Sequence, residues 1–219
     1  VRALPAAAID AAVDEEQGVG VVQPNNPDGQ HFGRHRLLAW HARLSARGGR
    51  LIVDEAFLDA EPEDSLVPLA SQPGLIVLRS VGKFFGLAGA RVGFAFAEAA
   101  VLDALAERLG PWAVSAPARA VTAAALSDGA WQASARRQLV EASARLSGLL
   151  ARHGLAGGSG TALFQWRPRP DAAAIHARLA GQGILTRLFD APAGLRFGLP
   201  GTESEWTRLD AALDRLNLT

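Results

Sequence analysis

Four short stretches rich in Val, Ile, Leu or Phe dominate the first hundred residues, and each has a Gly or Pro nearby. They cover residues 19–23, 50–54, 75–80 and 91–97. Their length and composition are typical of buried β-strands. Between the first two, residues 33–47 place their apolar side chains on one helical face before a Gly-Gly stop. Strand, helix and strand within about thirty-five residues predict a βαβ unit with parallel strands and a right-handed crossover.

The next two connections differ in length, and the difference sets the direction of the strands. Residues 55–74 are acidic, contain prolines and are long enough for a second crossover, with a short helix near residues 64–70. Residues 81–89 are too few, because a parallel connection needs a dozen or more residues. The fourth strand should therefore run antiparallel to the third. The sequence predicts an α/β fold with a mostly parallel sheet.

Polar residues follow these strands at points that meet at one edge of the sheet. Asn26, Asp54 and the pair Ser80 and Lys83 come at or just past the carboxyl ends of three strands. Arg91 begins the reversed strand, and a reversed strand begins at the edge where its neighbour ends. Open α/β sheets bind ligands at this edge, so the sequence predicts a ligand site there.

The second half of the chain changes character and predicts a small α+β domain. Residues 98–109 and 116–153 are helical by composition, with Pro111 and Pro117 as breaks, and the stretch 131–153 is long enough to bridge two domains. After a glycine-rich turn, strands are expected at residues 161–166, 183–188 and 195–199, and helices at residues 171–182 and 203–216. We therefore expect one domain over residues 1–130 and a second over residues 131–219.

Composition excludes several classes of function. The 22 basic residues balance the 22 acidic ones, so no basic excess predicts binding to nucleic acid or to an anionic membrane. Because there is no Cys, disulfides, thiolate catalysis and cysteine zinc sites are impossible. The apolar runs end well short of the ~20 residues of a membrane span. The acidic first 17 residues do not resemble a signal peptide, so a cytoplasmic protein is expected.

A single lysine stands in a chain that otherwise uses arginine for its positive charges. Arg occurs 21 times and Lys once, at Lys83. An arginine keeps its proton in a protein, whereas a lysine amine can lose it and attack a carbonyl group. Lys83 is therefore the candidate nucleophile, although the count alone leaves chance survival as an equal alternative.

Two histidines, His31 and His35, are spaced four residues apart near the start of the first predicted helix. No carboxylate or third ligand stands beside them in a pattern typical of a metal site. Solvated histidines are the simpler interpretation, and the sequence predicts no metal.

Three segments carry the polar residues of the predicted ligand site. Their sequences are Gln23-Pro24-Asn25-Asn26-Pro27-Asp28-Gly29, Ile52-Val53-Asp54-Glu55-Ala56-Phe57, and the run from Arg79 through Ser80, Lys83 and Arg91 to Gly93. Taken alone, the first is a turn and the second is a strand end whose acid caps the next turn. Together, in this order and on one edge, they resemble the pyridoxal-phosphate-dependent aminotransferase superfamily of fold type I. Within it they most resemble the histidinol-phosphate aminotransferase branch.

Two later segments, residues 110–117 and 195–201, are similar to threonine-phosphate decarboxylases of cobalamin biosynthesis. The resemblance covers the whole chain and implies a pyridoxal-phosphate enzyme that forms a homodimer. Residues 1–130 would be the carboxyl-terminal part of the large cofactor-binding domain, and residues 131–219 the small domain with its bridging helix. The implied reaction is decarboxylation of L-threonine O-3-phosphate to (R)-1-amino-2-propanol O-2-phosphate. Transamination of a related phosphorylated amino acid is the alternative.

The resemblance also implies a role for each polar residue of the predicted site. Lys83 would bond to the aldehyde carbon of the cofactor. Asp54 would pair with the pyridine nitrogen and keep it protonated, which makes the ring an electron sink. Asn26 would hydrogen-bond the cofactor's O3′ oxygen. Ser80 and Arg91 would bind the cofactor phosphate, because a guanidinium fork suits a phosphate dianion.

Two arginines of the second domain are candidates for binding the substrate. The resemblance assigns Arg196 to the substrate carboxylate. Arg187 is a weaker candidate for a second anionic group, because a surface arginine in an arginine-rich chain is the simpler interpretation. Together these residues would suit a small phosphorylated amino acid.

The chain departs from the family pattern in two respects. Phe57 stands where many transaminases have a Tyr that donates to O3′. Family members also have an N-terminal part that supplies a phosphate-binding cup and an aromatic stacked on the ring, and nothing in residues 1–17 replaces it. The resemblance thus implies that the N-terminal portion is missing. A non-catalytic fragment that only associates with a partner chain is the alternative from another class.

Overall fold

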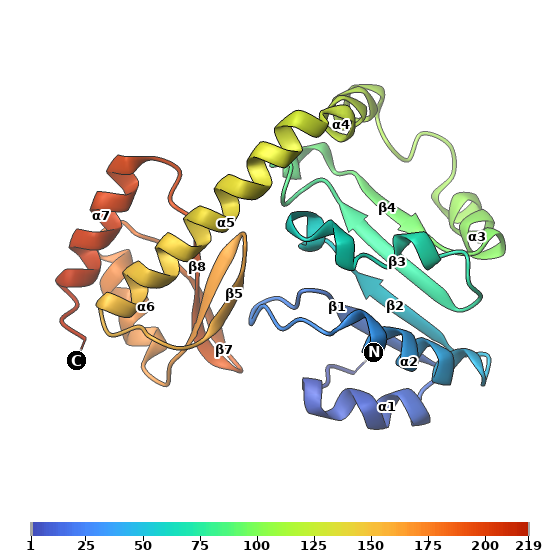
Figure 1. Cartoon of the computed structure of the whole chain (residues 1–219), viewed down its shortest axis with the longest axis horizontal. Coiled ribbons are helices and arrows are strands. Elements are labelled where there is room, and N and C mark those ends of the chain that lie inside the picture. The colour runs from blue at the N-terminus through green and yellow to red at the C-terminus, as the bar shows by residue number, and fades with distance from the viewer. Residues whose placement is uncertain (1, 219) are drawn as a thin grey trace. The chain divides into compact units, whose positions relative to one another are not determined.

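The first sheet has the strand order β1-β2-β3-β4 in the computed structural model, which describes residues 2–218 (Figure 1). Its strands are β1 (Gly18–Val22), β2 (Arg50–Asp54), β3 (Leu75–Ser80) and β4 (Gly93–Phe96). The first three strands run parallel, and β4 runs antiparallel to β3. The predicted mostly parallel sheet with a reversed fourth strand is therefore confirmed.

Two helices, α1 (Ile9–Glu15) and α2 (Arg34–Ser45), pack against one face of this sheet. Leu37, Trp40 and Leu44 of α2 lie on one helical face, and all three are buried in the core beneath the sheet. The helix predicted over residues 33–47 is thus confirmed. The sequence pattern does not predict α1, because the apolar stripe of this short helix is weak.

Between β2 and β3 the chain forms three short 3-10 helices, Leu58–Ala60, Pro62–Asp64 and Val67–Leu69. The short helix predicted near residues 64–70 is present as the 3-10 helix Val67–Leu69 and not as an α-helix. Pro68 explains the difference, because a proline inside an α-helix removes a backbone donor and clashes with the preceding turn. The segment still buries Leu66 in the core of the first sheet.

Three helices follow the first sheet: α3 (Ala99–Leu109), α4 (Ala116–Ser127) and α5 (Gly129–Arg152). The long helical stretch predicted from residue 116 is divided at Asp128, whose backbone leaves the helical region. Pro117 does not break a helix but lies in the first turn of α4, where its missing N–H has no intrahelical partner to lose.

The second sheet is entirely antiparallel and has the order β5-β6-β8-β7. Its strands are β5 (Ser159–Thr161), β6 (Phe164–Pro168), β7 (Arg187–Asp190) and β8 (Ala193–Gly198), with α6 (Ala172–Ala180) and α7 (Glu203–Asp214) as its helices. The single strand predicted over residues 161–166 is wrong, because the chain reverses at Ala162 and Leu163. The Thr161 hydroxyl stabilises this reversal by accepting a hydrogen bond from Leu163 N at 3.0 Å. The strand predicted from residue 183 begins only at Arg187.

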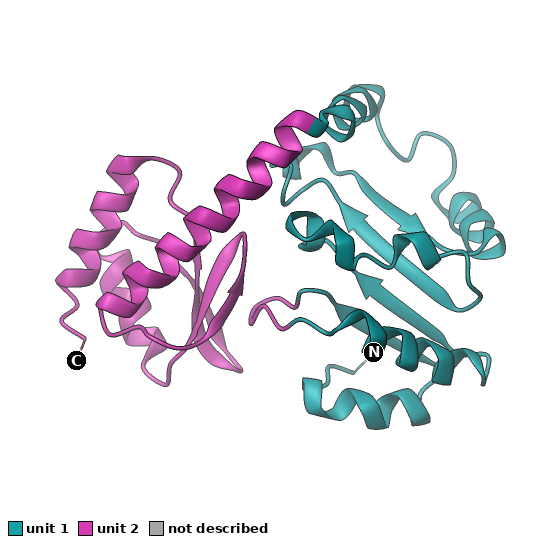
Figure 2. Ribbon diagram, in the orientation of Figure 1, with its two compact units in different colours: residues 1–24, 31–129 teal, residues 25–30, 130–219 magenta. Residues whose placement is uncertain are grey.

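The chain divides into two compact units (Figure 2). The first holds the residues up to Pro24 and residues 31–129, and its core lies between the first sheet and α1 and α2. The second holds residues 25–30 and the residues from 130 onward, and its core joins α5, α6 and α7 to β8. Within residues 2–218, no helix has the length and apolar character needed to cross a membrane.

Candidate functional site

Three of the candidate site residues lie at the same edge of the first sheet. Asp54 ends β2 and pairs with Leu78 of β3. Ser80 ends β3 and pairs with Gly93 of β4, two residues after Arg91. The antiparallel direction of β4 therefore places Arg91 at the edge where β2 and β3 end.

The backbone around Asp54 fixes its carboxylate at the strand end. Its Oδ1 atom accepts a hydrogen bond from Ala56 N at 3.0 Å, and the side chain is half-buried. A carboxylate in this position can pair with a cationic ring nitrogen, because an opposite charge nearby favours the ionised form.

Lys83 lies in the turn that follows β3. Ser80 Oγ accepts a hydrogen bond from Gly82 N at 3.1 Å at the start of this turn, and Gly86 N donates to the Lys83 carbonyl at 3.0 Å. The Lys83 side chain is exposed, and its Nζ atom lies 5.3 Å from the centre of the Phe57 ring. Phe57 thus contributes an aromatic face where a Tyr would add a hydroxyl.

Arg91 has a left-handed backbone conformation, with φ of 55°. Only Gly adopts this conformation freely, so an arginine here is a local strain of the kind that gathers at functional sites. The side chain is exposed and donates to the Ala88 carbonyl at 3.2 Å. A guanidinium at this edge can bind an anion.

In the second unit, Arg187 and Arg196 form a pair on one face of the sheet. They are register partners on β7 and β8. Both guanidinium groups contact aromatic rings: Arg187 lies over Phe189 at 5.5 Å, and Arg196 lies over Phe164 at 5.0 Å. Burial, together with the charge of Arg187, lowers the pKa of Arg196. Two positive charges that lie opposite each other over aromatic rings favour the binding of an anionic ligand.

Within the part of the chain that the structure describes, the Arg187 and Arg196 pair lacks an acidic counterpart. Among residues 2–218, no Asp or Glu side chain forms an ion pair with either guanidinium. The Arg187 side chain is exposed, as expected of a surface arginine, and its place opposite Arg196 is not predictable from the sequence. The tight hairpin between β7 and β8 creates the pair.

The turn Asn25–Gln30 packs within the second unit. Arg196 donates a hydrogen bond of 2.5 Å to Asn26 Oδ1. Gly29 has φ of 67°, and a Cβ atom there would lie 2.7 Å from the backbone carbon of Gly160. This close approach requires a glycine. Asn26 is therefore joined to the predicted substrate arginine, and its place beside Asp54 at the edge of the first sheet stays a prediction.

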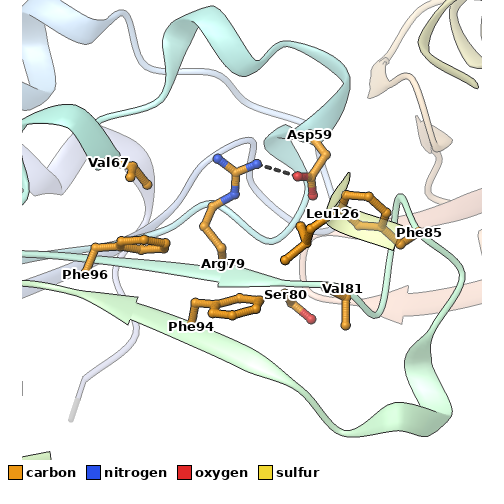
Figure 3. Close-up of a pocket in the computed structure, with 9 residues that line it drawn as sticks. All are labelled: Asp59, Val67, Arg79, Ser80, Val81, Phe85, Phe94, Phe96 and Leu126. Atoms are coloured by element: carbon orange, nitrogen blue, oxygen red, sulfur yellow. Dashed lines mark hydrogen bonds and ion pairs between the residues drawn. The ribbon is translucent and has the colours of Figure 1, made fainter. Parts of the chain in front are cut away.

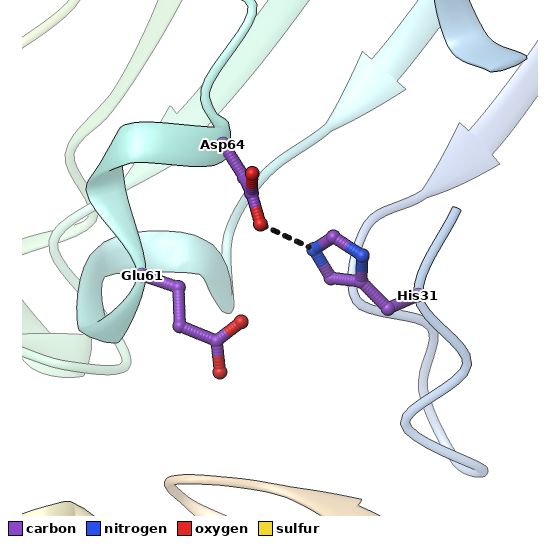
Figure 4. Close-up of side chains that lie close together, drawn as sticks. All are labelled: His31, Glu61 and Asp64. Atoms are coloured by element: carbon purple, nitrogen blue, oxygen red, sulfur yellow. Dashed lines mark ion pairs between the residues drawn. The ribbon is translucent and has the colours of Figure 1, made fainter. Parts of the chain in front are cut away.

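His31, Glu61 and Asp64 form a group whose ligand atoms lie within 4.8 Å of one another (Figure 4). The sequence does not indicate this group, because Glu61 and Asp64 lie thirty or more residues from His31. The three side chains are exposed or half-exposed. The Nε2 atom of His31 already has a partner in Gln23 Nε2 at 3.1 Å. The group carries no assignment as a metal centre.

A charged cluster that the sequence does not predict lies directly behind the sheet edge. Glu55, Asp59, Ser65 and Arg79, which we call the Arg79 cluster, join the segment after β2 to the end of β3. Arg79 and Asp59 also line a cavity of about 170 Å³ whose other walls are mainly apolar (Figure 3). The available signal in the sequence was Glu55, a second acid directly after an apolar strand, because an acid that becomes buried there requires a partner.

Comparison with known proteins places these features in a family. The chain matches the model for aminotransferase class I and II over residues 4–216. It is 54% identical over 213 residues to a threonine-phosphate decarboxylase of Pseudomonas aeruginosa, and 47% identical over 211 residues to one of a Sinorhizobium species. These matches cover 97% and 95% of the chain but 64% and 63% of the two relatives. The chain therefore spans less than two thirds of the length of these proteins.

A solved structure shares the fold. The histidinol-phosphate aminotransferase of Sinorhizobium meliloti, in complex with pyridoxal-5′-phosphate, superposes with a TM-score of 0.83 at 24% identity. The match covers 96% of this chain and 59% of that protein. The predicted architecture, part of a fold type I aminotransferase, is confirmed.

Proposed function

Because the chain belongs to the aminotransferase class I and II family, we propose that it acts in the pyridoxal-phosphate-dependent decarboxylation of L-threonine O-3-phosphate. The observation that carries the proposal is the 54% identity to a threonine-phosphate decarboxylase over 97% of the chain. The product would be (R)-1-amino-2-propanol O-2-phosphate, a building block for cobalamin biosynthesis. The proposal includes a cytoplasmic homodimer.

The residues at the edge of the first sheet fit pyridoxal phosphate by their chemistry. Asp54 offers a carboxylate for the ring nitrogen, and Ser80 and Arg91 offer a hydroxyl and a guanidinium for the phosphate. Lys83 offers the chain's one primary side-chain amine for the aldehyde carbon. Bound at this edge, the cofactor supplies an electron sink for the bond broken at the substrate α-carbon.

Lys83 also has a role in proton transfer. When carbon dioxide leaves the α-carbon, that carbon gains a proton in its place. In its ammonium form, Lys83 would be the group that delivers this proton to the α-carbon. Asp54 would keep the ring nitrogen of the bound cofactor protonated, because a carboxylate stabilises a cationic ring nearby.

The two arginines of the second unit suit a substrate with two anionic groups. Threonine phosphate carries a carboxylate and a phosphate, and the guanidinium groups of Arg187 and Arg196 stand in register on one face. Arg196 would bind the carboxylate in two hydrogen bonds, and Arg187 the phosphate. Asn26, which accepts from Arg196 at 2.5 Å, would hold the same guanidinium, and the resemblance assigns its amide group to the cofactor's O3′ oxygen.

Transamination is the second candidate, and the 34% identity over 218 residues to a histidinol-phosphate aminotransferase of Burkholderia mallei favours it. Both reactions use the same cofactor residues and differ in the bond that breaks at the α-carbon. In transamination, Lys83 would remove the α-proton. In decarboxylation, it would instead supply the proton that takes the place of the carboxylate.

Product analysis tests the proposal. The protein is incubated with pyridoxal phosphate and threonine phosphate, and carbon dioxide, aminopropanol phosphate and keto acid are measured. Carbon dioxide and aminopropanol phosphate in equal amounts are expected. A keto acid, formed when an amino-group acceptor is added, would establish the aminotransferase instead. No product and no change in cofactor absorbance would contradict both and favour the non-catalytic fragment.

A further inference from the structure

The Arg79 cluster buries an unusual amount of charge for a site so close to the surface. Glu55 is fully buried and Asp59 is 6% exposed. Arg79 forms ion pairs with both carboxylates and donates to Ser65 Oγ at 3.3 Å. Ser65 Oγ and Leu66 N in turn donate to the two oxygens of Glu55, at 2.5 Å and 2.7 Å.

Two carboxyl groups, those of Glu55 and Asp59, pair with one guanidinium in this cluster. Burial raises the pKa of Glu55, and the hydrogen bonds from Ser65, Leu66 and Arg79 oppose this effect. Buried charges are tolerated only when they are paired and hydrogen-bonded. A protein in which apolar residues replace such a buried ion pair is often equally stable. Stability alone therefore does not explain the cluster.

The position of the cluster suggests that role. Glu55 directly follows Asp54, and Arg79 directly precedes Ser80. The cluster thus connects the two strand ends at the residues from which the candidate cofactor ligands emerge. Figure 3 shows the Arg79 side chain reaching from β3 toward Asp59, beside the apolar walls formed by Phe94 and Phe96.

We propose that Arg79 is a positioning residue, which holds the segment after β2 against β3 so that Asp54 and Ser80 keep the spacing that one ligand requires. The ligand's identity rests on the proposed function, but the positioning itself does not. A planar guanidinium suits this task, because its donors can reach two carboxylates and a hydroxyl at once in a fixed geometry.

Amide hydrogen exchange of the Arg79→Met variant tests the positioning directly. Two backbone amides report on the site: Ala56 N donates to the Asp54 carboxylate, and Gly82 N donates to the Ser80 hydroxyl. We expect both amides to exchange at least about tenfold faster, while the amide of Val53 within β2 changes less. The matched control is Arg43→Met, which removes an exposed ion pair with Asp14 in the same unit and should leave both amides unchanged.

Exchange at wild-type rates in Arg79→Met would overturn the inference. An increase at Ala56 and Gly82 that only equals the increase at Val53 would also overturn it, because that pattern reports a general loss of stability. Arg79→Lys keeps the positive charge but loses the planar guanidinium. The two amides should therefore be better protected from exchange than in Arg79→Met and less protected than in the wild type.

Titration with pyridoxal phosphate separates this inference from the proposed function. If the wild-type chain binds the cofactor, Arg79→Met should bind at least about tenfold more weakly, and Arg79→Lys should fall between the two. Binding within twofold of wild type by Arg79→Met would contradict the positioning role. Absence of binding by the wild-type chain would contradict the proposed function, and the exchange experiment would still decide the role of Arg79.

Discussion

In the first unit, the candidate site residues Asp54 and Ser80 stand at the ends of parallel strands, whereas Arg187 and Arg196 of the second unit stand within antiparallel strands. Parallel strands all end at one edge, so residues from distant segments meet there. Antiparallel strands bring register partners together on a face. The strand ends of the first unit suit a ligand that is bound by the loops after the strands. The register pair of the second unit suits a ligand that lies on the face of the sheet.

The two units also bury arginine differently. Arg79 of the first unit is held by two carboxylates. Arg167 of the second unit is 3% exposed, and burial lowers its pKa. It donates to neutral acceptors, among them the carbonyls of Leu155 and Trp166, both at 2.8 Å, and Ser147 Oγ at 3.0 Å. We infer that Arg79 serves the site, while Arg167 joins α5 to the sheet.

The largest expected effect tests whether the cofactor attaches to the first unit, while the second unit binds only the substrate. If the cofactor belongs to the first unit, Lys83→Arg should abolish covalent attachment entirely, because a guanidinium keeps its proton and does not attack the aldehyde. Borohydride reduction in the presence of pyridoxal phosphate, followed by peptide mapping, measures attachment. The wild-type label should fall on Lys83 alone, and Arg196→Gln should be labelled like the wild type. A label confined to the N-terminal amine would contradict the assignment.

The second prediction addresses the contrast between the buried arginines. Arg167→Met should destabilise the second unit by about 3–4 kcal/mol, because hydrogen bonds to a charged group are worth about 1.5–3 kcal/mol each and part of that loss is offset by removing a buried charge. Denaturant unfolding measures the change, and hydrogen exchange locates it. Arg152→Met, which removes only an exposed contact with Asp210 at 3.9 Å, should change stability by no more than about 0.5 kcal/mol. Equal effects of the two substitutions would show that Arg167 does not join α5 to the sheet.

The third prediction sharpens the assignment of substrate binding to the second unit. Arg196→Gln should weaken the binding of threonine phosphate by about a hundredfold, since losing a bidentate contact with a carboxylate costs about 3 kcal/mol. Its affinity for pyridoxal phosphate should stay within a few-fold of wild type. Isothermal titration of cofactor and substrate in turn measures both. A variant that loses both affinities together would show that the units do not divide the two tasks.

The contrast between the units also explains how far the sequence predicted the structure. The first sheet was predictable because its strands are short apolar runs, and the brief connection over residues 81–89 leaves β4 only one direction. Asp54, Ser80 and Arg91 could be placed at one edge for the same reason. Topology alone supplied these positions, without any knowledge of side-chain contacts.

The rest depended on contacts that adjacent residues do not reveal. Ala162 and Leu163 lack the Gly or Asn typical of a hairpin turn, so β5 and β6 looked like one strand. The partners of Arg79 come from twenty or more residues upstream or from the turn at Ser65. Register pairing of Arg187 with Arg196 required the hairpin to be known. Each of these features is set by tertiary structure, which the local pattern does not encode.

The smallest expected effect concerns one glutamate of each unit, because folding shifts the pKa values of these two residues in opposite directions. Glu205 of α7 accepts from the backbone N–H groups of Gly201 at 2.7 Å and Thr202 at 3.0 Å, in a capping box. These hydrogen bonds lower its pKa below the ordinary 4.5. Burial instead raises the pKa of Glu55 above that value. The carboxylate is therefore favoured by folding in the second unit, and the protonated acid in the first.

The two shifts give opposite dependences on pH. Stabilisation by Glu205 is complete above the pKa of the unfolded chain and is lost as pH falls through the lower folded value. Stabilisation by Glu55 is complete below the unfolded pKa and is lost as pH rises through the higher folded value. The destabilisation caused by Glu205→Gln should thus grow from pH 3 to pH 7, and that caused by Glu55→Gln should shrink. Urea unfolding of both variants and the wild type across this range measures the slopes. If the destabilisation caused by the two substitutions changed with pH in the same direction, folding would shift the pKa values of both carboxyl groups in the same direction. The contrast between the buried Glu55 and the exposed helix cap Glu205 would then be wrong.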